Sequence, residues 1–343
     1  MKEQQTIYFD SNVYGHIAEV NEAEKIKHFL MNNNIRLLLS QTILMEVIRI
    51  SDRGIREKRA TTVSTLCNFF YQRSNSYYLA KEIISEISKH RVGWLKKNPD
   101  LSTIKYLNSY WKRRWKNIQK NNWHTLYKGS PGFEDIVFDV VGKNKEIQKK
   151  IREVNPLLDN VVVEHPNPTI SKIINSISDN IEKCFRSQYA IMWFRALNGE
   201  PNLRDLNDWV APYFNINKVD RDDWTMFWVR DLDIECVPLN YIDGTVVFFQ
   251  PRTRVTAGNP FDVDHAANLL KCDIFFTADK GFYEVLEETK KYLMNKGFTI
   301  DAVIILLDRG KESVLDQLKT IVRELYGKSH QHLQPLGIPD TKN

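Results

Sequence analysis

The sequence has few cysteines and no long apolar stretch. Its four cysteines (Cys67, Cys184, Cys236 and Cys272) are scattered among 343 residues without Cys-X-X-Cys or Cys/His spacing. This spacing indicates neither a disulfide framework nor a zinc site, and we expect buried free thiols. The longest uncharged apolar runs, residues 189–194 and 245–249, fall far short of the roughly 18 residues that a membrane helix needs. The sequence therefore predicts no membrane partner.

The first residues also do not resemble a secretory leader. The first residues, MKEQQTIYFD, contain no apolar core ahead of a small-residue cleavage site, so we expect a cytoplasmic protein. The composition, 42% hydrophobic and 27% charged, is that of a folded protein and excludes wholesale disorder. The length predicts either two domains or one domain with a large insertion.

Positive charge is concentrated in one segment. Residues 89–128 contain eleven Lys and Arg residues against the single acid Asp100, together with seven Trp and Tyr residues. Cations bind phosphates and flat rings stack on unpaired bases, so this mixture predicts contact with a single-stranded nucleic acid. The alternative is a helical pair with aromatic residues in its core and basic residues on its wet face. The candidate contact residues are Trp111, Lys112, Arg113, Arg114, Trp115 and Lys116.

Short apolar runs alternate with helical patterns at both ends of the chain. The runs at residues 6–9, 35–39, 274–277 and 302–307 are typical of buried parallel strands. Helical spacing occurs at residues 13–31, 41–50, 262–271, 282–295 and 311–326. Strands that alternate with helices predict one α/β sheet assembled from two distant segments.

The middle of the chain has a different pattern. Residues 56–235 show helical periodicity at 61–86, 104–119, 170–197 and 224–232, which predicts a mainly helical insertion. Residues 1–55 and 236–327 would then form the sheet-containing domain together. We expect residues 328–343 to be a loose tail.

Four acids occupy positions where open α/β sheets commonly build their sites. Asp10 ends the first strand, Glu46 lies on the helix after the second strand, Asp262 opens a later helix and Asp279 follows the strand FFT. A pocket of such carboxylates needs a cation, and hard oxygen ligands select Mg²⁺ or Mn²⁺. A lone Asp after a strand commonly does no more than cap the next helix. The prediction of a metal site therefore rests on the four acids together and not on any one of them.

With the motifs YFDSNVYG, SQTILMEV and NPFDVDHAANLLKCDIFFTADKGF, the chain resembles the PIN-domain ribonucleases. The resemblance covers only the two end segments. It implies a PIN-like three-layer α/β fold with a central, mostly parallel sheet, split here by the large helical insertion. It also implies a metal-binding, catalytic acidic pocket at Asp10, Glu46, Asp262 and Asp279. Asn12, Ser40 and Thr277 match polar positions that help to order such a pocket.

Two features depart from this family pattern. The segment between Glu46 and Asp262 is far longer than in the family, so substrate choice does not carry over. Asp264 lies two residues after Asp262, off its helical face, and either adds a fifth metal ligand or points to solvent. His265 shares a face with Asp262 and either holds a water or phosphate or serves as a packing residue.

These observations predict a divalent-metal-dependent nuclease that hydrolyses phosphodiester bonds of single-stranded RNA. RNA is favoured over DNA only because the family mostly cuts RNA. One alternative is a non-catalytic nucleic-acid- or protein-binding module on the same fold. Another is the toxin of a toxin–antitoxin pair, which would have an inhibitory protein partner. The sequence does not specify the substrate sequence or whether cleavage is endo- or exonucleolytic. It also leaves the oligomeric state open, and a homo-oligomer is one alternative.

Overall fold

The computed structural model describes residues 4–67, 73–123, 161–252, 259–310 and 313–327. The predicted tail at 328–343 and the end of the basic segment, residues 124–128, lie outside the described residues.

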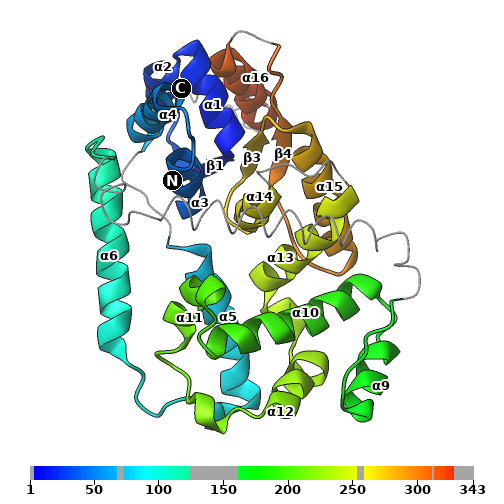
Figure 1. Cartoon of the computed structure of the whole chain (residues 1–343). Helices are drawn as coiled ribbons and strands as arrows, with labels where there is room; N and C mark the ends of the chain where they lie inside the picture. Colours follow the sequence, from blue (N-terminus) through cyan, green and yellow to red (C-terminus); the bar gives the residue numbers. More distant parts are fainter. Residues whose placement is uncertain (1–3, 68–72, 124–160, 253–258, 311–312, 328–343) are drawn as a thin grey trace, which may run out of the picture.

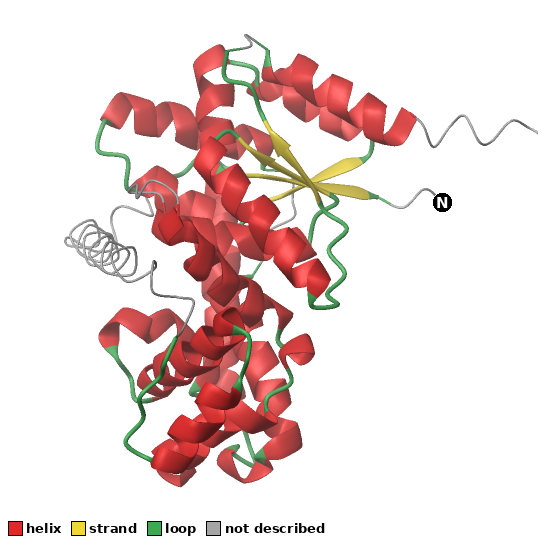
Figure 2. Ribbon diagram, turned by 90° about the vertical axis from the view of Figure 1, so that its right-hand side faces the viewer, coloured by secondary structure: helices red, strands yellow, loops and turns green. Residues whose placement is uncertain are grey.

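A parallel sheet of four strands lies at the centre of one half of the molecule (Figures 1 and 2). The strands are β1 (Gln5–Phe9), β2 (Ile35–Leu38), β3 (Ile274–Thr277) and β4 (Val303–Leu306), and their order is β2-β1-β3-β4. Ile7 of β1 pairs with Ile274 of β3, so the two ends of the chain build one sheet. All four predicted strands and the α/β class are confirmed.

Seven helices surround the sheet in the described residues. They are α1 (Ser11–Val20), α2 (Ala23–Asn32), α3 (Gln41–Ile48), α4 (Arg53–Leu66), α14 (Asn259–Ala266), α15 (Lys280–Asn295) and α16 (Val314–Gly327). The helical spacing over residues 13–31 corresponds to two helices, α1 and α2. Asn21 adopts a left-handed conformation with φ of 55° and ends α1, a conformation that Asn tolerates better than most residues.

The prediction of a mainly helical insertion is confirmed, and Figure 2 shows its helices gathered below the sheet. They are α5 (Asn75–His90), α6 (Leu101–Gln119), α9 (Pro168–Ser176), α10 (Asn180–Leu197), α11 (Arg204–Val210) and α12 (Arg221–Met226), with α13 (Pro238–Phe249) leading back to the sheet. The predicted helix over 170–197 is two helices, because Asp179 caps a new helix by accepting a hydrogen bond from the Glu182 N–H.

The two faces of the sheet belong to two hydrophobic clusters. Alternate strand residues point to opposite faces, so Ile7 and Phe9 pack with α1, α2, α4 and α16, while Tyr8 packs on the other side. The cluster around Tyr8 continues into the insertion as far as Trp193 and Trp228. The helical part therefore shares one continuous core with the sheet, and the domain division at residues 56 and 235 stays a prediction.

Two expectations from the composition can be checked in the described residues. None of their helices is both long enough and apolar enough to span a membrane. All four cysteines are free, as predicted, but only Cys67 and Cys272 are buried, whereas Cys184 and Cys236 are half-buried.

Candidate active site at the carboxyl edge of the sheet

The strand order places a topological switch point between β1 and β3. The chain leaves β1 toward β2 on one side and leaves β3 toward β4 on the other, so the segments that follow these two strands diverge. Ligands of open α/β sheets bind in the crevice that such a divergence opens at the carboxyl ends of the strands. Asp10 follows β1 and Asp279 lies two residues beyond β3, so both acids are at this point.

Thr277 joins these two acids. Its hydroxyl donates a hydrogen bond to Asp10 Oδ2 at 2.5 Å and accepts one from the Asp279 backbone N–H at 3.0 Å. Burial raises the pKa of Asp10, and the hydrogen bond from Thr277 opposes that shift. The predicted ordering role of Thr277 thus corresponds to two direct hydrogen bonds.

Asp10 and Asp279 also cap helices. Asp10 Oδ1 accepts a hydrogen bond from the Val13 N–H at 2.9 Å, and Asp279 Oδ1 accepts one from the Phe282 N–H at 3.0 Å. Both acids therefore have the helix-capping role that is common for an Asp after a strand. Capping leaves each carboxylate able to make further interactions, because each oxygen has a second lone pair.

Glu46 belongs to a buried chain of hydrogen bonds. His265 Nε2 lies 2.6 Å from Glu46 Oε2, and His265 Nδ1 lies 2.5 Å from the Tyr8 hydroxyl, which in turn contacts Ser40 Oγ at 2.8 Å. Burial alone would lower the pKa of His265, but the attraction of Glu46 and other nearby carboxylates raises it. The nearby carboxylates therefore favour the protonated form of the histidine.

This chain specifies the surroundings of His265 and Ser40. Both ring nitrogens of the buried His265 have protein partners, which agrees with the packing role that was one of its two alternatives. Ser40 is the residue before α3 and makes no capping hydrogen bond, and its hydroxyl contacts Tyr8. The sequence analysis missed Tyr8, whose ring gave no signal other than that of a strand residue.

Asp262 lies in the first turn of α14, which begins three residues earlier, and accepts a hydrogen bond from Gln250 Nε2 at 3.2 Å. Its pKa is raised to about 7, chiefly by burial; the negative charges of Glu46, Asp279 and Asp10 contribute to this increase, and His265 opposes it. The four predicted acids are therefore close enough to interact electrostatically.

The fit of a divalent cation can be judged from these groups. Carboxylates are the ligands that Mg²⁺ and Mn²⁺ prefer, and the raised pKa of Asp262 reflects first its burial and then the repulsion of the neighbouring acids. In the described ranges, however, no three His, Cys, Asp or Glu side chains are arranged to hold a metal ion. Thr277 holds Asp10 and His265 holds Glu46 instead. The carboxylate oxygens are thus suitable ligands for the cation, although in this arrangement the side chains do not form a coordination sphere around it.

The other two candidate residues lie in different surroundings. Asn12 Oδ1 is 3.4 Å from a guanidinium nitrogen of Arg309, and the described residues give it no hydrogen bond to the four acids. Asp264 is half-buried rather than exposed, and its carbonyl and Oδ1 accept hydrogen bonds from Asn75 Nδ2 at 2.6 and 3.4 Å. Asp264 thus points away from solvent and toward the helical part.

A second set of titratable side chains surrounds Asp264 and was missed by the sequence analysis. Burial raises the pKa of Asp243 and of Glu82 to about 7 each and that of Asp205 to about 6, and it lowers the pKa of Lys271 to about 8. Tyr189 donates a hydrogen bond to Asp243 at 2.5 Å. Most of these residues come from α5, α10, α11 and α13, and Lys271 follows the 3-10 helix Ala267–Leu270. No motif links them in the sequence. Only tertiary packing brings them together.

The predicted nucleic-acid contact residues on α6 differ in how deeply they are buried. Lys112, Arg113 and Lys116 are exposed, but Trp115 is 1% exposed and packs against the helices beside the sheet. The prediction that Trp115 stacks on a base was therefore wrong. Trp111 is half-buried against the other cluster, and the Arg114 guanidinium lies 4.4 Å from the centre of the Tyr110 ring.

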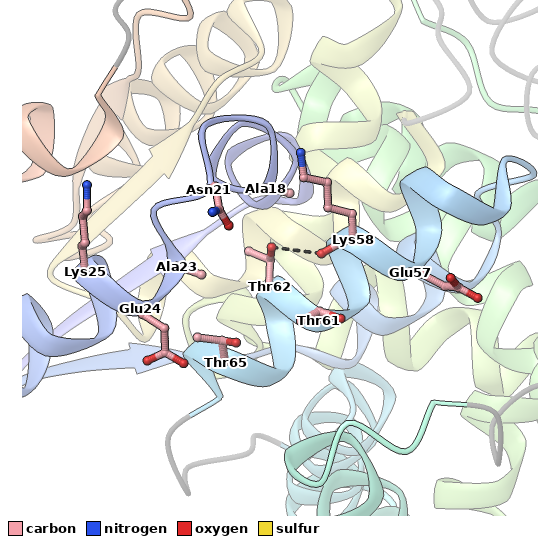
Figure 3. A pocket seen from close by; sticks show the side chains of 10 residues that line it. All are labelled: Ala18, Asn21, Ala23, Glu24, Lys25, Glu57, Lys58, Thr61, Thr62 and Thr65. Atoms are coloured by element: carbon pink, nitrogen blue, oxygen red, sulfur yellow. Dashed lines mark hydrogen bonds between the residues drawn. The ribbon is translucent and has the colours of Figure 1, made fainter.

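A separate hollow of about 640 Å³ lies between the α1–α2 turn and α4 (Figure 3). Its lining is polar and includes Asn21, Lys58 and Thr62, whose hydroxyl donates to the carbonyl of Lys58. None of the four acids lines it, so this hollow is not part of the candidate site.

Comparison with known proteins adds no assignment. No protein family, no curated protein and no solved structure was found to match this chain. The resemblance to the PIN-domain ribonucleases stays a prediction.

Proposed function

We propose that this protein is a divalent-metal-dependent nuclease that hydrolyses phosphodiester bonds in single-stranded RNA. The observation that carries the proposal is the electrostatic coupling of Asp262 to Asp10, Glu46 and Asp279 at the switch point of the sheet. Coupled acids in a crevice where α/β folds bind ligands are typical of functional sites.

In this proposal, Asp10, Glu46, Asp262 and Asp279 hold Mg²⁺ or Mn²⁺. When bound, the cation would supply Lewis-acid activation of the phosphodiester. Thr277 fixes the orientation of Asp10 through its 2.5 Å hydrogen bond and holds the backbone of Asp279. His265 orients Glu46 and lowers the cost of burying it.

One observation favours a second candidate function, a non-catalytic binding module on the same fold. Glu46 already has a buried partner in His265, whose protonated form the surrounding acids favour without any metal. Binding of Mn²⁺ separates the two candidates. A ligand that binds only the folded state raises the melting temperature, so the nuclease proposal expects a rise with Mn²⁺ that is absent from Asp262→Asn.

Cleavage assays test the proposal directly. We expect the purified protein to cut end-labelled single-stranded RNA in Mg²⁺ or Mn²⁺ but not in EDTA, and Asp10→Asn and Asp279→Asn to lower the rate by about a hundredfold or more. Asn is also a good N-cap, so both variants keep their helix caps and should fold. Single-stranded DNA run in parallel measures the preference between the polymers.

Asp243→Asn is the matched control, since it removes one buried carboxylate from the second set and leaves the four acids intact. It should cut at nearly the wild-type rate. The proposal fails if the wild type shows no metal-dependent cleavage, or if Asp10→Asn cuts as well as Asp243→Asn.

A further inference from the structure

One face of α6 carries cations that have no acidic partner. Among the described residues, no carboxylate forms an ion pair with any of the exposed side chains Lys105, Lys112, Arg113, Lys116 and Lys120. Some cations elsewhere are paired: Arg91 contacts Asp223 and Asp231, and Arg186 contacts Glu182. What distinguishes α6 is the concentration of such cations on one helix that contains no acid, and this concentration is complementary to a polyanion.

Helical geometry places these cations together. Lys105, Lys112 and Lys116 are seven and eleven residues apart, a spacing that keeps them on one side of a helix. The opposite side is fixed by packing, because Trp115 and Ile118 are buried beside α4. Lys112 and Lys116 are also four residues apart, so they repel each other, and a bound anion would relieve that repulsion.

A row of flat groups borders the cations. Tyr106, Tyr110 and Arg114 follow one another at four-residue intervals. The two tyrosine rings lie 6.3 Å apart with 31° between their planes, and the Arg114 guanidinium lies 4.4 Å from the Tyr110 ring. Tyr106, at the end of the row, is 61% exposed. An exposed ring beside cations is the combination that holds single strands, because a base can stack while its phosphates are neutralised.

We propose that this face of α6 binds a single-stranded nucleic acid, with phosphates along Lys105, Lys112 and Lys116 and a base stacked on Tyr106. The choice of nucleic acid among polyanions rests on the proposed function. Figure 1 shows α6 running along one side of the molecule, beside both the sheet region and the helical part. It packs on α4, which packs on α3, the helix that carries Glu46. The surface is thus two helices away from the candidate site.

Binding can be measured apart from cleavage. The experiment is fluorescence anisotropy of a labelled single-stranded RNA with the full chain in EDTA, so that no metal-dependent cutting occurs. We expect Lys112→Glu/Lys116→Glu to weaken binding about tenfold or more and to reduce the slope of log K against log salt by about 1.4. The control Lys172→Glu/Lys291→Glu makes the same change in net charge at exposed lysines on α9 and α15, and should stay within about twofold of wild type.

Tyr106 provides a second, uncharged test. Tyr106→Ala should weaken binding about fivefold, whereas Tyr106→Phe keeps the ring and should bind like the wild type. All these side chains are exposed, so melting temperatures should change little.

Three results would overturn this inference: no binding of the single strand by the wild type, equal losses in the α6 and control variants, or normal binding by Lys112→Glu/Lys116→Glu. Failure of the proposed function looks different. A protein that binds RNA through α6 but never cuts it in Mg²⁺ or Mn²⁺ retains this surface and loses the nuclease.

Discussion

Asp262 and Asp264 are two residues apart on α14 but belong to different networks. Asp262 interacts with Asp10, Glu46, Asp279 and His265 at the carboxyl edge of the sheet. Asp264 contacts Asn75 and interacts with Asp243, Asp205 and Lys271 on the side of the helical part. Residues two apart on a helix point in different directions, so one short helix supplies an acid to both networks.

The two networks handle their charge differently. In the sheet network, His265 uses both ring nitrogens and is held by Glu46 and Tyr8, which fixes the position of its ring beside the acids. In the second network, burial lowers the pKa of Lys271, whose ammonium lies 4.2 Å from the Tyr78 ring centre. The comparison teaches that burial and a raised pKa do not identify a functional site by themselves. The sheet network differs by its place at the switch point.

Removing His265 should have the largest effect on stability. His265→Ala removes the buried partner of Glu46 and one of the two partners of the Tyr8 hydroxyl, which keeps its contact with Ser40, so we expect a loss of about 3 kcal/mol in the free energy of unfolding. Urea denaturation measures it, with the exposed His28→Ala on α2 as control. A loss no greater than that of the control would mean that the histidine does not hold this network together.

The second network predicts a pH-dependent effect of intermediate size. With a pKa raised by burial from 3.8 to about 7, Asp243 binds a proton in the folded state but not in the unfolded state between these values. Its contribution to stability therefore falls as pH rises through this range, and the full penalty is present above pH 7.

We therefore expect Asp243→Asn to stabilise the protein by about 1–2 kcal/mol at pH 8 and much less at pH 4, since Asn can still accept the Tyr189 hydrogen bond. Thermal and urea unfolding at both pH values measure the difference. The exposed Asp301→Asn serves as control. An equal gain at both pH values would contradict a buried, protonated Asp243.

Ser40 offers the smallest effect. Ser40→Ala removes one hydrogen bond from the Tyr8 hydroxyl, which keeps its bond to His265, so we expect a loss of about 1 kcal/mol. Urea denaturation beside the exposed Ser109→Ala checks this. If Ser40→Ala lowered the free energy of unfolding as much as His265→Ala does, the contact between Ser40 and Tyr8 would contribute as much to the stability of this network as the histidine.

Much of the architecture around the sheet could be predicted from local pattern. The apolar runs before Asp10 and Asp279 are continuous because parallel strands are buried on both faces. The break at Asn21 was missed because apolar spacing continues across it, and a left-handed residue leaves no trace in periodicity. The burial of Trp115 was missed because the sequence does not show which side of α6 meets α4.

The strands, the helical character of the insertion and the positions of four acids at the ends or starts of elements can be predicted from local sequence. These features follow from the local spacing of apolar residues and from the chemistry of single side chains. The partners of the acids, Thr277 for Asp10 and His265 for Glu46, depend instead on the tertiary fold. These pairs join residues more than 200 positions apart, and their contacts depend on the pairing of β1 with β3 and the packing of α14 beside α3. No local pattern in the chain specifies such distances.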